Sequence, residues 1–75
     1  MPRFKKIDVR PLLARGEEPF GAIQTALGTL EPGQGLSVIA PFLPSPLIER
    51  LKGAGFQAQV ERRADGGWQA DFWRD

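Results

Sequence analysis

The chain contains no cysteine, no histidine and no tyrosine among its 75 residues. Without cysteine there is no disulfide framework, no thiol nucleophile and no thiolate ligand for a metal. Without histidine, zinc and haem lose their most usual protein ligand. These absences remove the common catalytic and cofactor-binding groups. We therefore expect a protein that is not an enzyme and that holds no cofactor and no metal.

Long apolar runs are also missing. No stretch approaches the roughly 20 apolar residues that span a bilayer, and the first ten residues lack the apolar centre of a secretory signal. We therefore expect a cytoplasmic protein with no membrane contact. Hydrophobic residues make up 41% of the chain and charged residues 25%, which is ordinary for a folded globular domain. A chain this short has room for one domain, expected over residues 1–75, with a thin core.

The net charge of +1 is unevenly distributed along the chain. Most of the cations near the start precede Pro11, whereas the next segment is acidic. Four of these cations suggest RNA binding through the first strand as one function hypothesis, and they are Arg3, Lys5, Lys6 and Arg10. The charge imbalance is small, so this hypothesis ranks last and nucleic acid is not the expected partner.

The first half of the chain predicts a strand, a helix and a second strand. Apolar and charged residues alternate over residues 4–10, which indicates a strand, and residues 11–18 then read as a loop. Pro19 suits the first position of a helix, because the missing N–H has no partner there. Gly33 follows a proline and predicts a type II turn after the helix. The apolar residues 36–40 suit a central strand buried on both faces.

The second helix is marked at both ends. It begins at Pro44 or Pro46, and Ser45 before the second of these is a suitable N-cap. A Schellman motif with Gly55 in the left-handed conformation predicts its end, and this motif would bring Phe56 against Leu51.

Two alternating segments, residues 56–61 and 68–73, predict a closing β-hairpin. A three-residue loop over residues 65–67 pairs Val60 with Phe72 and keeps the apolar side chains on one face, with Gly67 in a left-handed bulge position. The predicted order is β-α-β-α-β-β. Strands joined by a helical crossover are parallel, so we expect an α/β (α+β) two-layer sandwich: a four-stranded mixed sheet with two helices on one face.

The carboxyl ends of the first two predicted strands define a candidate binding site, because sites in sheets of parallel strands form there. We expect a shallow site formed by five residues at this end: Arg10, Glu18, Pro19, Phe42 and Leu43. Glu18 also has a simpler interpretation, in which its charge offsets the positive end of the helix dipole. The free N–H groups of the same helix end would suit a small anion.

The uncovered face of the sheet is a second candidate surface. By alternation Trp73 points to this face together with Arg63. A lone tryptophan there either covers the strands or anchors a protein interface.

Several short motifs resemble a known family, the uncharacterised bacterial domains numbered 2249 among domains of unknown function, which are similar to the TusA-like (SirA-like) sulfur carriers. The motifs are Ile7-Asp8-Val9-Arg10, Glu18-Pro19-Phe20 and Leu30-Glu31-Pro32-Gly33-Gln34, followed by the hairpin. The sulfur carriers hold a reactive cysteine before the proline that begins the first helix, and Glu18 stands at that position here. A second proline of the carrier motif is replaced by Gly21. A persulfide requires a thiolate, so carrier activity does not transfer with the resemblance.

Three function hypotheses follow. The first is a non-enzymatic binding or protein-interaction domain that resembles the sulfur carriers in fold. The second is an accessory domain that binds a small anion, cofactor or metal at the start of the first long helix. The third is the RNA-binding hypothesis given above. The resemblance further implies a redox or iron- or haem-handling protein as the partner.

Overall fold

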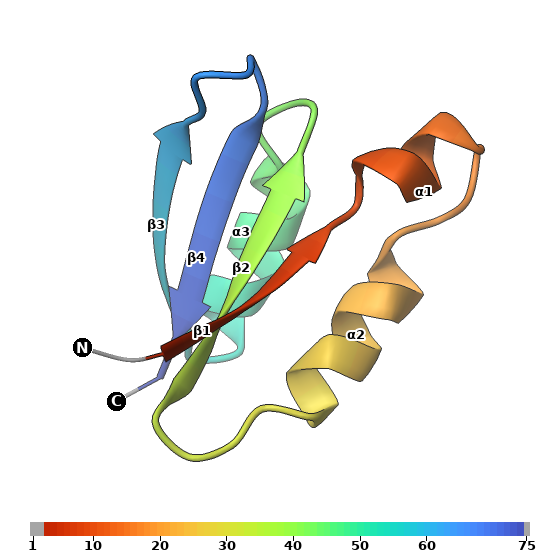
Figure 1. Cartoon of the computed structure of the whole chain (residues 1–75). Coiled ribbons are helices and arrows are strands. Elements are labelled where there is room, and N and C mark those ends of the chain that lie inside the picture. The colour runs from red at the N-terminus through yellow and green to blue at the C-terminus, as the bar shows by residue number, and fades with distance from the viewer. Residues whose placement is uncertain (1–2, 75) are drawn as a thin grey trace.

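The structure is a computed structural model that describes residues 3–74, so both ends of the domain expected over residues 1–75 lie outside the described residues. The elements in chain order are β1 (Arg3–Asp8), α1 (Arg10–Ala14), α2 (Phe20–Gly28), β2 (Gln34–Ala40), α3 (Ser45–Gly53), β3 (Gln57–Arg62) and β4 (Trp68–Trp73). The strands form one sheet with α2 and α3 packed on the same face (Figure 1). The predicted two-layer α+β arrangement is confirmed.

The sheet has the order β1-β2-β4-β3. Strand β1 runs parallel to β2, whereas β2 pairs with β4, and β4 with β3, in antiparallel fashion. Central strand β2 is buried along almost its whole length, as its continuous apolar sequence predicted. The core lies between the sheet and the two longer helices and consists of Val9, Ile23, Ala26, Leu36, Val38, Ala40, Leu51, Ala70 and Phe72.

Two glycine-based helix ends agree with the sequence patterns. Gly33 has φ of 80°, and the Gln34 N–H donates to the Glu31 carbonyl at 3.0 Å, which closes the predicted turn before β2. At the end of α3, Gly55 has φ of 96° and the Phe56 N–H donates to the Leu51 carbonyl at 3.0 Å. This bond is the long hydrogen bond of a Schellman motif.

The helix starts differ from the sequence expectation by one residue each. Pro19 is the N-cap residue of α2 rather than its first helical residue. Ser45 is the first residue of α3, with Pro44 as its N-cap, so the N-cap role predicted for Ser45 is wrong. The physical reason is local: the Ile48 N–H donates to the Pro44 carbonyl at 3.0 Å, and this first helical hydrogen bond makes Pro44 the N-cap and places Ser45 inside the helix.

The segment predicted as a loop after the first strand contains a short helix, α1. Strand β1 ends at Asp8 rather than at Arg10. Pro11 lies in the first helical turn, where its missing N–H costs nothing. The side chains of Leu12 and Leu13 pack against the core, and that burial favours a helical turn over an open loop.

The hairpin has the predicted faces but a different register. Val60 pairs with Ala70, and Phe72 pairs with Ala58. The loop comprises residues 64–66 and the left-handed glycine is Gly66, with φ of 88°. A shift of two residues leaves every side chain on its original face, so alternation alone could not exclude the observed register.

Candidate functional site

A groove of about 420 Å³ opens on the helical side of the sheet. It arises because α2 packs over β1 and β2 while α3 packs over β3. Its floor is formed by Val38 and Ala40 of β2 and by Val9. The complete lining is Val9, Leu13, Glu18, Pro19, Phe20, Ile23, Val38, Ala40, Phe42, Pro44, Pro46, Leu47 and Arg50. The volume lies within the range of ligand-binding pockets, and the lining is apolar apart from two charged side chains.

The first charged side chain, Glu18, is held by the start of α2. Its carboxylate accepts hydrogen bonds from the Phe20 N–H at 2.6 Å and from the Gly21 N–H at 3.3 Å. A carboxylate at this position satisfies N–H groups that lack a partner in the helix and offsets the positive end of the dipole. An external anion would have to compete with Glu18 for these donors.

The second charged side chain, Arg50 of α3, reaches across the groove to α2. Its guanidinium carbon lies 4.2 Å from the centroid of the Phe20 ring, a cation–π contact. Within residues 3–74 its N–H groups make no hydrogen bond or ion pair. Arg50 is therefore a positioned cation whose five donors remain available at the groove.

The loop after β2 extends the apolar surface beyond the groove. Phe42 lines the groove and is 53% exposed, and its neighbour Leu43 is 41% exposed without belonging to the lining. Phe42 and Leu43 thus form an exposed apolar patch beside the groove, and such patches are typical of contact surfaces.

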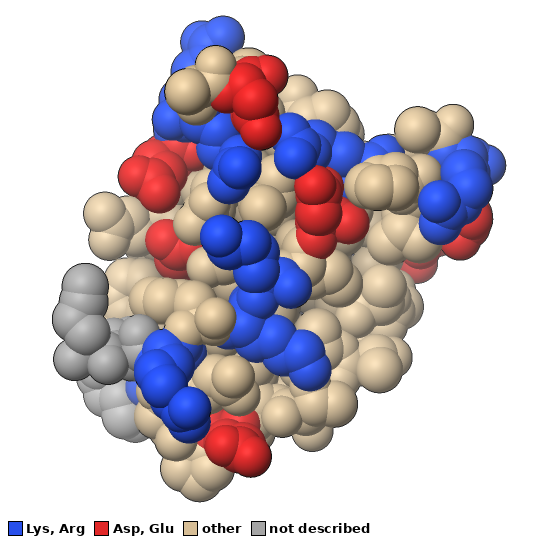
Figure 2. All heavy atoms as spheres, viewed as in Figure 1, with Lys and Arg blue, Asp and Glu red and all other residues tan. Residues whose placement is uncertain are grey.

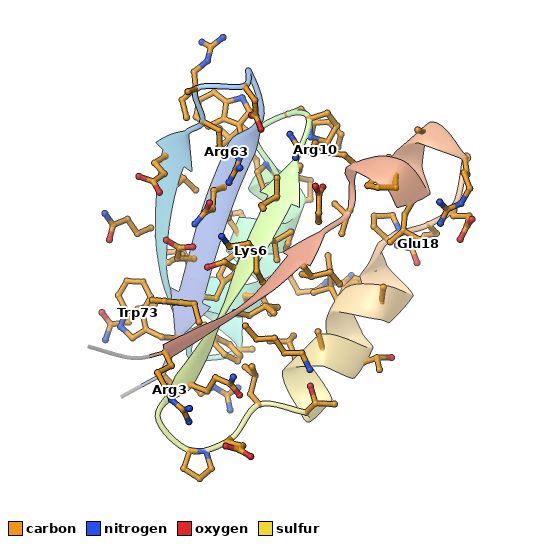
Figure 3. The ribbon with its side chains drawn as sticks, in the orientation of Figure 1. Arg3, Lys6, Arg10, Glu18, Arg63 and Trp73 are labelled. Atoms are coloured by element: carbon orange, nitrogen blue, oxygen red, sulfur yellow. The ribbon has the colours of Figure 1, made fainter. Side chains whose placement is uncertain are left out.

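The structure thus brings three of the five sequence-predicted site residues, Glu18, Pro19 and Phe42, into one groove. Arg10 lies elsewhere, at the turn end of the sheet near Arg63 and apart from Glu18 (Figure 3). Its guanidinium bridges the Asp8 carboxylate at 2.8 Å and the Asp65 carboxylate at 3.0 Å.

The same cluster includes Arg63, whose guanidinium also contacts Asp65, at 3.2 Å. The Gly67 N–H bond and the Arg10 contact hold the pKa of Asp65 well below its ordinary value of 3.8. The Arg10 hydrogen bonds lower the pKa of Asp8 in the same way. Arg10 and Arg63 therefore tie the hairpin turn to the end of β1, and their donors are committed within the fold.

These depressed pKa values predict how stability depends on pH. A carboxyl whose pKa is lowered in the folded state stabilises the fold above its unfolded pKa, and this stabilisation is lost as pH falls toward the folded value. We expect the wild-type melting temperature to fall below about pH 4. Asp65→Asn should make this dependence shallower in thermal melts from pH 5 to pH 2. Glu49→Gln is the control, because Glu49 forms no ion pair within residues 3–74. If the melting temperature of Asp65→Asn fell with pH as steeply as that of the wild type, Asp65 would not be a source of the pH dependence.

The uncovered sheet face carries a network of polar side chains on β2 and β4. Asp71 accepts hydrogen bonds from the Ser37 hydroxyl and from the Gln69 amide, and the Gln69 oxygen accepts one from Arg63 at 2.8 Å. Trp73 contacts Phe4 edge-to-face, with ring centroids 6.2 Å apart. Lys and Arg side chains extend down the middle of this face, and Asp and Glu side chains lie mostly toward its margins (Figure 2).

The basic first strand is divided between two faces. The Lys5 ammonium donates to the Thr29 hydroxyl on the helical side at 2.7 Å, whereas Lys6 lies on the uncovered face (Figure 3). Arg3 pairs with Glu31 at 3.6 Å. The strand therefore does not present its cations as one row toward an RNA backbone.

Sequence reasoning missed the α3 wall of the groove, above all Arg50. A signal was present, because Arg50 follows Leu47 by three residues and so shares its helix face.

Within residues 3–74 no group of three or more acidic side chains is placed to hold a metal ion. None of the described helices has the length and apolar character that crossing a membrane requires.

The fold is that of a small α+β domain in which α2 and α3 lie on one face of a mixed sheet and leave an apolar groove between them. The chain belongs to the family described as "Uncharacterized conserved protein (DUF2249)", whose sequence profile matches residues 6–74. Neither a curated protein nor a solved structure matches the chain.

Proposed function

We propose that this domain acts by docking a partner protein in the groove between α2 and α3, rather than by catalysing a reaction. The observation that carries the proposal is the continuity of the apolar groove with exposed Phe42 and Leu43. A small ligand would fill the groove against one side of Phe42 and would leave Leu43 in water. A polypeptide segment can cover all of the apolar surface at once.

The chemistry of the lining supports binding over catalysis. The groove holds no thiol, imidazole or hydroxyl side chain, and its carboxylate already accepts two backbone N–H bonds. The likeness to sulfur carriers fits this proposal, since a carrier whose reactive cysteine is replaced by Glu18 would retain only its docking role. A redox or iron- or haem-handling protein of the cytoplasm remains the expected partner.

The anion-binding alternative is less well supported, because Glu18 occupies the N–H groups that would hold the anion. The RNA-binding alternative is disfavoured by the internal partners of Arg3, Lys5 and Arg10.

Phe42→Ala tests the proposal. An exposed aromatic anchor contributes strongly to binding when a partner covers it, so we expect the affinity of the natural partner to fall about tenfold or more. The partner is isolated on the immobilised wild-type domain, purified, and titrated by isothermal calorimetry against each variant.

Val60→Ala is the matched control, because Val60 is 40% exposed on β3 and lies outside the groove. Its affinity should equal that of the wild type. Equal affinity for all three proteins, or a loss with Val60→Ala alone, would contradict docking at the groove.

A further inference from the structure

The positive charge at the groove specifies the partner segment further. Glu18 and Arg50 are the charged residues of the lining, and they differ in whether their side chains have hydrogen-bond partners within the fold. The Glu18 carboxylate accepts hydrogen bonds from two N–H groups at the start of α2, so part of its accepting capacity is already used. Arg50 has no carboxylate or carbonyl partner within residues 3–74. The charged group that meets a docked segment without a hydrogen-bond partner is therefore the Arg50 guanidinium.

The contact with Phe20 prepares Arg50 for an anionic partner. The guanidinium carbon is 4.2 Å from the ring centroid, so the ring restricts the long side chain without using its N–H groups. A guanidinium held in this way loses little freedom when it forms two parallel hydrogen bonds to a carboxylate. Burying it under a purely apolar segment would instead leave its donors unsatisfied, which is costly.

We infer that the groove recognises a peptide segment of a partner protein that presents an apolar side chain next to an aspartate or glutamate. The apolar side chain enters the groove over Val38 and Ala40, and the carboxylate bonds to Arg50. This inference rests on the proposed function, since it names the chemistry of the segment that docks there.

Selection from a random peptide display library tests both the docking of a peptide in the groove and its preference for an acidic residue. The full domain is used as bait in three forms: wild type, Arg50→Glu and Lys52→Glu. Lys52 is the matched control, because it lies in the same last turn of α3 and outside the groove lining. Enriched peptides are synthesised, and their affinities are measured by fluorescence anisotropy, with binding located by NMR shifts.

We expect wild-type and Lys52→Glu baits to enrich apolar residues beside Asp or Glu, and Arg50→Glu to weaken those peptides about tenfold or more. The Arg50→Glu bait should itself enrich Lys or Arg beside the apolar residue. NMR shifts should fall on groove residues such as Phe20 and Leu47.

Two other outcomes separate the inference from the proposed function. Apolar peptides that bind the groove with no acidic preference, or with equal loss in Arg50→Glu and Lys52→Glu, would overturn the inference and leave groove docking standing. No enriched peptide, or shifts confined to the uncovered sheet face, would overturn both.

Discussion

Phe72→Ala should leave much of the chain unfolded near room temperature. Phe72 is fully buried, and its strand neighbours in register are Leu36 and Ala58. Truncating a buried phenylalanine costs about 3–5 kcal/mol, through lost apolar burial and the cavity that remains. A domain of this size without disulfides has a total stability on the order of 5 kcal/mol. The substitution therefore removes most of the free energy of unfolding.

Thermal and urea melts followed by circular dichroism would measure this effect. For a domain of this length each kcal/mol shifts the melting temperature by about 4–8 °C, so we expect a fall of about 12 °C or more. Phe42→Ala deletes the same atoms at a residue that is 53% exposed and should melt close to the wild type. A Phe72→Ala domain that melts within a few degrees of the wild type would show that the core repacks.

The same contrast explains why the site can be tested separately from the fold. The floor of the groove consists of buried residues that also belong to the core, such as Val38. Phe42 and Arg50 lie at the exposed edge of the groove, its rim, and do not belong to the core. Variants at the rim can therefore change binding without unfolding the domain.

The order of elements could be predicted because glycines and prolines mark most of the boundaries. Gly33 and Gly55 adopt the left-handed conformations that their turn and cap require, and such conformations favour glycine strongly. The hairpin register was missed because loops over residues 64–66 and 65–67 give strand pairings that differ by two residues, which is the side-chain period of a strand. The helix α1 was missed because its stability comes from burying Leu12 and Leu13, not from local propensity.

The positions of some candidate site residues were predictable, because chain direction determines where they lie. Glu18 and Phe42 both follow from the rule that sites form beyond the carboxyl ends of parallel strands. Arg10 lies outside the groove because it bridges Asp8 and Asp65, and Asp65 lies 55 residues away along the chain. A pairing of that kind depends on tertiary structure, and alternation within a strand carries no information about it.

Gly35→Ala is the second substitution with a large expected effect. The cause is a steric clash of the added Cβ atom rather than an unfavourable backbone conformation. A Cβ atom at this position would lie 2.5 Å from Cε1 of Phe4 and 2.6 Å from the carbonyl oxygen of Phe72. The Phe4 ring covers Gly35 on the uncovered face, where it also meets Trp73. An aromatic ring over a strand glycine compensates for the side chain that the glycine lacks.

Overpacking of this kind costs about 1–3 kcal/mol, so we expect the melting temperature to fall by about 4 °C or more. Gly21→Ala is the matched control, because a Cβ there meets nothing within 4 Å, and alanine in a helix is neutral or stabilising. The double variant Phe4→Ala, Gly35→Ala should recover only part of the loss. Removing the ring relieves one contact, whereas the carbonyl of Phe72 belongs to the β4 backbone and cannot move without straining the central β2–β4 pairing. Full recovery in the double variant would mean that the ring alone requires glycine here.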